Sequence, residues 1–238
     1  MCILGSVMVT SVAAADELVD EKSLSLFQQM SETLGQAPTL RFTAQTLFDH
    51  VEPSGVKTKH GMVQEITIMR PDRLHFRTQP EGGPVRMGWY DGKTLTIAVP
   101  ARQIYAQVDA PDTLDELLDL LQDRYSVQLP VVDLLYSDFF GKIESHVLSG
   151  VLLGETAIDG RPQQHLSFET TPGDVQLWID RSEVAPVPRR MVVTLVALEN
   201  EPEVLMHFGD WVLGDYVDPS LFEFEPHDSW SKVDLSER

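Results

Sequence analysis

The segment from Ile66 to Val108 constrains the fold most, because apolar and polar residues alternate along it in four short runs. A period of two turns one side of each run toward a core and the other toward water, as in antiparallel strands. Turn-forming residues separate the runs. The strongest of these signals is Asp91-Gly92, since both residues tolerate the backbone angles of a two-residue hairpin. The segment therefore predicts a curved antiparallel sheet.

Further alternating runs occur on both sides of this segment and extend the predicted sheet to roughly ten strands. They lie at 40–48, 60–69, 147–156, 163–170, 175–180, 189–196 and 204–211. A last short strand is predicted around Phe222 and Phe224, and the polar tail from Pro226 is expected to be loosely held. Strands without alternating helices argue against a parallel sheet.

Three helices are predicted between these runs. Residues Asp16 to Gly35 carry apolar side chains on one face. After the capping residues Asp112 and Thr113, four leucines form an apolar stripe. A short helix is expected to begin at Pro130. Since no long linker or fixed repeat divides the chain, we expect one domain, residues 16–238, with the helices packed on one face of the sheet.

The first fifteen residues predict export. An apolar run from Ile3 to Val12 is followed by Ala13-x-Ala15, a pattern typical of signal-peptidase sites, although no basic residue precedes the run. The run is too short to span a bilayer, which needs about 20 residues. Residues 1–15 are therefore interpreted as the remainder of a signal peptide; an apolar N-terminal strand is the alternative.

Charge and motif content narrow the classes of function. The 238 residues carry 37 acids against 18 bases, a net charge of −19, which disfavours binding to nucleic acid and to anionic membrane surfaces. The seven histidines lack metal-ligand spacing, and the single cysteine, Cys2, excludes an intrachain disulfide. No nucleophile elbow or phosphate-binding loop occurs. We therefore predict no catalytic residue, metal or cofactor, and a protein that is not an enzyme, while a triad or carboxylate pair assembled in space stays open.

A set of short motifs, in order, resembles the DUF2092 family of predicted bacterial periplasmic proteins over residues 24–224. The motifs are R-P-D-R-L (70–74), Y-D-G-K-T-L-T (90–96), Y-A (105–106), T-L-D-E-L-L-D-L-L (113–121), L-P-V-V-D-L-L-Y (129–136), Q-L-W-I (176–179) and P-R-R-M-V-V-T (188–194). The family in turn is similar to the LolA/LolB lipoprotein-carrier fold. This resemblance implies a mainly β, α+β fold, an incomplete antiparallel barrel with helices over its open concave side, and a periplasmic location. It transfers no site residue.

An incomplete barrel of this kind offers an apolar hollow that a leucine-bearing helix could cover. The predicted function is a periplasmic binder or carrier of a hydrophobic ligand, an acyl chain or a lipid-linked protein. The predicted contacts are Phe42, Phe76, Trp89, Leu95 and Ile97 from the sheet, with Leu114, Leu118 and Leu121 from the covering helix. The alternative for each residue is a permanently filled core. The alternative function is an interaction module that docks onto an envelope protein through a sheet edge or the acidic surface.

Overall fold

A computed structural model of the chain describes residues 19–125, 130–171, 173–181 and 185–234. The predicted signal segment, residues 1–15, lies outside them. Within the described ranges, no helix is both long and apolar enough to cross a membrane.

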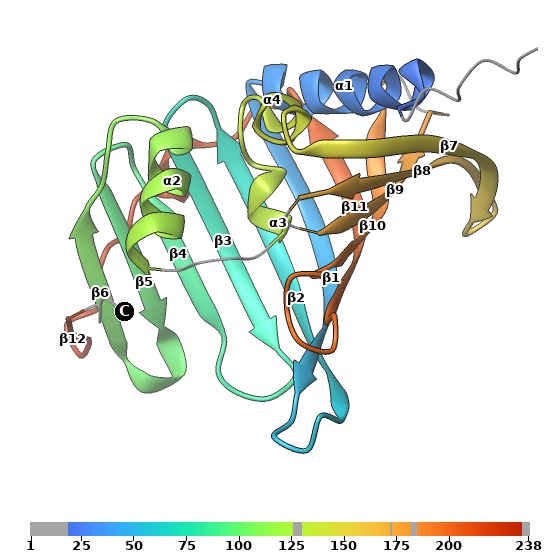
Figure 1. The fold of residues 1–238 in the computed structure, drawn as a ribbon. Coiled ribbons are helices and arrows are strands. Elements are labelled where there is room, and N and C mark those ends of the chain that lie inside the picture. Colours follow the sequence, from blue (N-terminus) through green and yellow to red (C-terminus); the bar gives the residue numbers. More distant parts are fainter. Residues whose placement is uncertain (1–18, 126–129, 172, 182–184, 235–238) are drawn as a thin grey trace, which may run out of the picture.

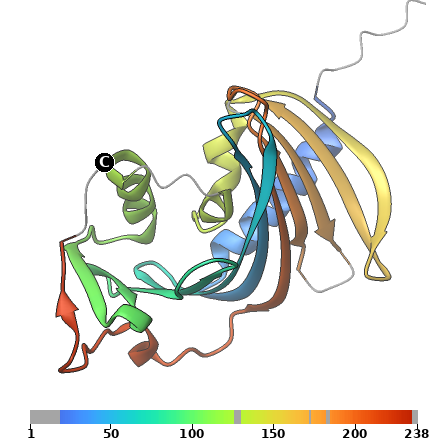
Figure 2. The same ribbon diagram turned by 90° about the horizontal axis from the view of Figure 1, so that it is seen from below.

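The twelve strands of the described residues form one sheet in the order β12-β6-β5-β4-β3-β2-β1-β11-β10-β9-β8-β7. All neighbours are antiparallel except β12 and β6. The strands are β1 Thr39–Val51, β2 Lys57–Met69, β3 Arg73–Pro80, β4 Arg86–Tyr90, β5 Thr94–Val99, β6 Ile104–Asp109, β7 Val147–Ile158, β8 Arg161–Thr170, β9 Asp174–Asp180, β10 Val187–Thr194, β11 Glu203–Leu213 and β12 Ser231–Lys232. The sheet bends into an open half-barrel with the helices on its concave side, which confirms the predicted architecture (Figures 1 and 2).

The concave face is apolar because of the alternation along each strand. In β1, Leu40, Phe42 and Ala44 are buried, and the residues between them point to the convex side. β1 pairs with β2 over its whole length, so Ile66 and Ile68 of β2 lie on the same face. These side chains belong to a single core cluster that spans both halves of the sheet.

Helix α1, Glu21–Gln36, crosses the concave side near one end of the strands (Figure 2). It begins later than predicted, because the Asp20 side chain caps it by accepting a hydrogen bond from the Lys22 N–H. Its buried Phe27 ring meets two phenylalanines of α4, Phe139–Glu144, edge-on, with centroids 5.2 and 5.3 Å apart. The sequence prediction had residues 138–143 leading into strands; they form α4 instead, because the adjacent Phe139 and Phe140 both bury against α1.

Helix α2, Leu114–Tyr125, is the predicted leucine-bearing helix. Thr113 and Glu116 cap it reciprocally: the Thr113 hydroxyl donates to the Glu116 carboxylate at 2.9 Å and accepts from the Glu116 N–H at 3.3 Å. The short helix α3, Pro130–Asp133, begins at the predicted proline. α2 lies over β3 to β6, and α3 and α4 lie toward the middle of the sheet (Figure 1).

The C-terminal segment packs on the convex face, which corrects two predictions. Residues Pro219–Phe222 form a 3-10 turn rather than a strand, and Phe222 is fully buried. The tail is held more firmly than expected, because β12 pairs with Ile104 and Tyr105 at the start of β6. The rings of Phe224 and Trp230 contact each other and belong to a second, smaller apolar cluster on this face.

Close packing at Gly88 predicts a size limit there. A Cβ at Gly88 would lie 2.1 Å from Cε1 of Phe76, so we expect Gly88→Ala to lower the free energy of unfolding by about 1–3 kcal/mol in urea denaturation. Adding Phe76→Leu should recover part of this loss, because the clash involves the ring. Gly82→Ala is the control, since no atom lies within 4 Å of its added Cβ. If the changes in unfolding free energy of Gly88→Ala and Phe76→Leu simply add in the double variant, the clash is contradicted.

Candidate functional site

Seven of the eight predicted ligand contacts lie on the concave side and belong to the core cluster or pack against it. Four are buried in the core cluster and three are partly buried against it. The buried residues are Phe42, Leu95, Leu114 and Leu118, and the partly buried ones are Phe76, Ile97 and Leu121. In this arrangement the α2 leucines pack directly on the sheet.

The eighth residue, Trp89, lies on the opposite face. Its neighbours in β4, Gly88 and Tyr90, are buried on the concave side, so alternation turns Trp89 to the convex side. There its ring contacts His75 at 5.4 Å and Phe224 at 4.9 Å between centroids. Trp89 therefore belongs to the aromatic cluster under the C-terminal segment and does not join the other seven.

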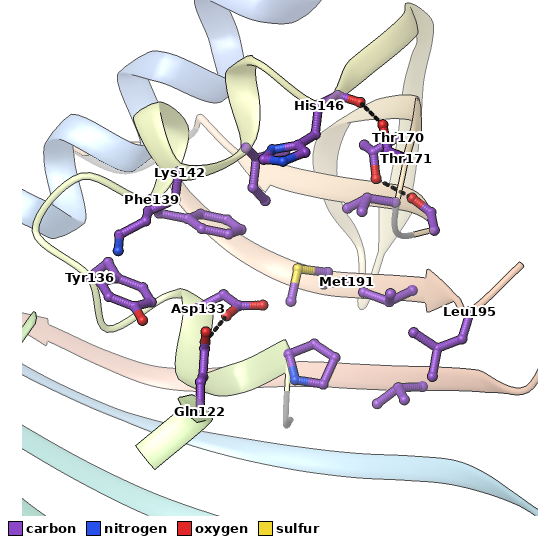
Figure 3. A pocket seen from close by; sticks show the side chains of 16 residues that line it. Gln122, Asp133, Tyr136, Phe139, Lys142, His146, Thr170, Thr171, Met191 and Leu195 are labelled. Carbon is purple, nitrogen blue, oxygen red and sulfur yellow. Dashed lines mark hydrogen bonds between the residues drawn. The ribbon is translucent and has the colours of Figure 1, made fainter. Parts of the chain in front are cut away.

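A cavity of about 520 Å³ lies beside this core, between α3 and α4 on one side and β9 to β11 on the other (Figure 3). None of the eight predicted contacts lines it. The lining residues are Gln122, Pro130, Asp133, Tyr136, Phe139, Lys142, Ile143, His146, Thr170, Thr171, Gly173, Val175, Met191, Val193, Leu195 and Val204.

The strand side of the cavity is an apolar wall. Met191 and Val193 alternate along β10 and face the helices, and they pair with Met206 and Val204 of β11. Val175 of β9 pairs with Val193 and continues the wall. The side chains of this wall have no polar group that would lose a hydrogen bond to water when an alkyl chain covers them.

The opposite side carries polar groups that tie α2 to the segment between α3 and α4. Asp115, Asp119 and Gln122 recur at i, i+4 and i+7 and so share one side of α2; we refer to them as the polar row. At its beginning, the Asp115 carboxylate accepts hydrogen bonds from the Ser137 N–H at 3.0 Å and from the Ser137 hydroxyl. The polar row thus turns toward the segment that follows α3.

The rest of the polar row makes three further contacts. The Asp119 carboxylate accepts from the Tyr136 hydroxyl and from the Lys142 ammonium group, each at 2.8 Å. The hydrogen bond from Lys142 is the main cause that lowers the pKa of Asp119. The Gln122 amide donates to Asp133 at 3.3 Å. Every member of the polar row therefore bonds to the α3–α4 segment.

Arg70, at the corner between β2 and β3, holds the same segment from the sheet side. Its guanidinium donates to the carbonyl oxygens of Leu135 at 3.0 Å, Tyr136 at 3.3 Å and Leu34 at 3.4 Å. Burial lowers the pKa of Arg70, and the nearby Asp115 opposes this effect. One partly buried cation thus joins α1, the α3–α4 connection and the sheet.

Asp133 is the unusual group of the cavity lining. It is the one charged residue in the otherwise apolar or aromatic run from Pro130 to Tyr136. Burial raises its pKa to about 6, while the hydrogen bond from Gln122 and the charge of Lys142 act in the opposite direction. A lone carboxylate in such a run was a sequence signal for the site that the prediction did not use.

A second hollow, of about 830 Å³, is polar and lies against the opposite face of β8, β10 and β11. Its lining includes Arg161, Gln163, Arg189 and His207. The buried carboxylate of Asp180 lies 3.1 Å from Arg189 Nε and 3.9 Å from Arg161. These ion pairs are a structural explanation for the charges there, and the polar lining does not suit an alkyl chain. Across the described residues, no cluster of three or more His, Cys, Asp or Glu could hold a metal ion.

Comparison with known proteins adds a family and similar folds. A family model described as "Predicted periplasmic protein (DUF2092)" matches residues 24–236, and no curated protein matches the chain. Similar structures include the lipoprotein LppX of Mycobacterium tuberculosis (13% identity, TM-score 0.48, 84% of this chain and 98% of that chain) and LprF of Mycobacterium bovis (13%, 0.49, 84% and 96%). A LolA superfamily protein of Nitrosomonas europaea is also among them (15%, 0.39, 84% and 97%). At these identities the likeness is one of fold alone and says nothing about a ligand.

The contact between Asp119 and Tyr136 predicts how firmly α2 is held. Tyr136→Phe keeps the ring but removes the hydroxyl donor, so we expect a loss of about 0.5–1.5 kcal/mol and faster amide hydrogen exchange in Leu114–Tyr125. Tyr216→Phe is the matched control, since Tyr216 is 86% exposed. Unchanged exchange in α2 would show that this contact does not hold the helix.

The raised pKa of Asp133 predicts that this residue contributes less to stability as the pH rises. Between about pH 4 and pH 6 the folded protein binds more protons at this site than the unfolded chain, so the contribution of Asp133 to stability falls as pH rises through this window. We expect Asp133→Asn to be more stable than the wild type at pH 8, by up to about 3 kcal/mol, with a smaller difference at pH 5.

Thermal and urea unfolding at the two pH values measure this difference. Asp123→Asn is the control, because it removes the same charge from an exposed position of α2. An equal effect of Asp133→Asn at pH 5 and pH 8 would contradict a raised pKa.

Proposed function

The chain belongs to the DUF2092 family of predicted periplasmic proteins, and we propose that it binds a hydrophobic ligand in the cavity between α3, α4 and β9 to β11. The ligand is a lipid or the acyl chain of a lipid-linked protein, and the role is binding or carriage without catalysis. The periplasmic location predicted from the sequence is confirmed by the family description.

The single observation that carries the proposal is the cavity itself. Protein interiors are close-packed, whereas sites for small molecules measure about 300–1,000 Å³ and are mostly apolar. A hollow of about 520 Å³ beside an apolar wall fits the second description. Each buried CH₂ group contributes about 0.8 kcal/mol, so a sixteen-carbon chain offers about 12 kcal/mol before ordering costs.

Helix α2 gives the site a way to enlarge. Its leucines pack on the sheet, while its polar row is bonded to the α3–α4 segment that lines the cavity. In the proposed mechanism the C-terminal end of α2 parts from α3 while Asp119 keeps its contacts, and the apolar surface beneath α2 becomes continuous with the cavity. The seven concave-side residues predicted from the sequence then contact the distal part of a long ligand.

Adjacent valines on β10 allow a matched test. Val193 lines the cavity, whereas Val192 faces the other side of the strand. We expect Val193→Trp to fill part of the cavity and to weaken binding of a neutral hydrophobic dye, N-phenyl-1-naphthylamine, by about tenfold, with Val192→Trp unchanged. Native mass spectrometry of protein purified from the periplasm of its host should show bound lipid in the wild type and less bound lipid in Val193→Trp.

Equal dye binding by both variants, together with lipid-free protein, would contradict the proposal. That outcome would instead favour the alternative, an envelope interaction module. One observation favours this alternative: β7 is a terminal strand of the sheet, and three of its apolar side chains are exposed, Leu148 by 59%, Val151 by 45% and Leu153 by 56%. A strand edge of this kind can pair with an extended segment of another protein.

A further inference from the structure

The cavity has an apolar wall and, opposite it, one acidic and one basic side chain. Among the described lining residues these are Asp133 from α3 and Lys142 from α4. The head group of an amphiphilic ligand would meet whichever of the two charges is not already neutralised. Their contacts therefore decide which head group the cavity accepts.

Lys142 is already paired. Its ammonium group donates to the Asp119 carboxylate at 2.8 Å and lies 4.3 Å from the centre of the Tyr136 ring. Figure 3 shows this end of Lys142 beside Tyr136, on the far side of Phe139 from Met191. A carboxylate ligand would have to compete with Asp119 for this cation.

Asp133 is only half paired. One carboxylate oxygen, Oδ1, accepts a hydrogen bond from Gln122 at 3.3 Å, and none of the described residues donates to Oδ2. In Figure 3 the carboxyl group points toward the strand that carries Met191, into the space that the apolar wall bounds. The Asp133 carboxylate is partly shielded from water and receives one hydrogen bond from a neutral amide. A cationic donor would therefore stabilise it more than a neutral donor would.

We propose that the ligand is an amphiphile with an ammonium head group, which pairs with the Asp133 carboxylate while its alkyl chain lies along Met191, Val193 and Val204. This inference rests on the proposed function, because it assigns the ligand class of the same cavity. The net charge of −19 acts in the same direction, since it attracts cations and repels anions.

Three twelve-carbon probes that differ only in head group test the inference: dodecylamine, dodecanol and dodecanoate, each used below its solubility limit and, where it forms micelles, below its micelle concentration. Displacement of the neutral dye at pH 7.5 gives their affinities. We expect wild-type protein to bind the amine about tenfold or more tighter than the alcohol, and the carboxylate most weakly. In Asp133→Asn the amine should bind no tighter than the alcohol, whereas Asp123→Asn should keep the wild-type order.

The pH profile of the wild type is a second measurement that needs no variant. Lowering the pH from 7.5 to 5 protonates Asp133, so the advantage of the amine over the alcohol should shrink to about twofold or less. Among the other lining residues, Gln122 from α2 and Lys142 from α4 act on the pKa of Asp133, and His146, after α4, is a histidine of the same cavity. Since histidines titrate in the same range, His146→Gln separates the two groups: whatever its effect on overall affinity, the advantage of the amine should still shrink on acidification, and loss of that pH dependence would assign it to His146 and overturn the role of Asp133.

The inference is overturned if the three probes bind equally, if the carboxylate binds tightest, or if the preference for the amine survives in Asp133→Asn. Each of these results leaves the proposed function intact, because the alkyl chain still binds. Failure of the proposed function looks different: neither the neutral dye nor any probe binds, and no lipid co-purifies.

Discussion

The need to cover one apolar face of a bent sheet determines most of this structure. Alternation along strands such as β1 places Leu40, Phe42 and Ala44 on the concave side, where an open half-barrel would leave them in water. Three separate elements remove this surface from solvent: α1, α2 and the α3–α4 segment. Because they are not continuous with one another, polar contacts must fix their positions, and Arg70 and the polar row of α2 provide them.

The cavity lies where the covering elements are shortest. α1 has 16 residues and α2 has 12, and both bury several apolar side chains. α3 and α4 have only four and six residues and bury few side chains, namely Val131, Phe139 and Phe140. The space left between them and β9 to β11 is therefore a consequence of the topology, and Asp133 of α3 and Lys142 of α4 line it.

Much of the fold could be predicted from the sequence, but the position of the site could not. Period-two alternation identified the sheet, and the capped leucine stripe identified α2, since both signals are local. The cavity depends on which strands and helices meet across the sheet, which periodicity does not reveal. Trp89 illustrates the limit: an apolar residue in an alternating strand predicts burial but not which face receives it, and here the C-terminal segment covers the convex face. α4 was missed because six residues contain too little periodicity to distinguish a helix from a strand.

The two ends of the sheet are unequal. At one end β12 lies along β6, with hydrogen bonds between residues 231–233 and 103–105, so part of that edge is already occupied. At the other end, an isolated bridge from Val19 to Gly150 is the described pairing on the outer side of the long strand β7. If copies of this chain joined by adding strand to strand, β7 offers the longer free edge. Two copies joined β7 to β7 would form a closed pair in which each has used its long edge.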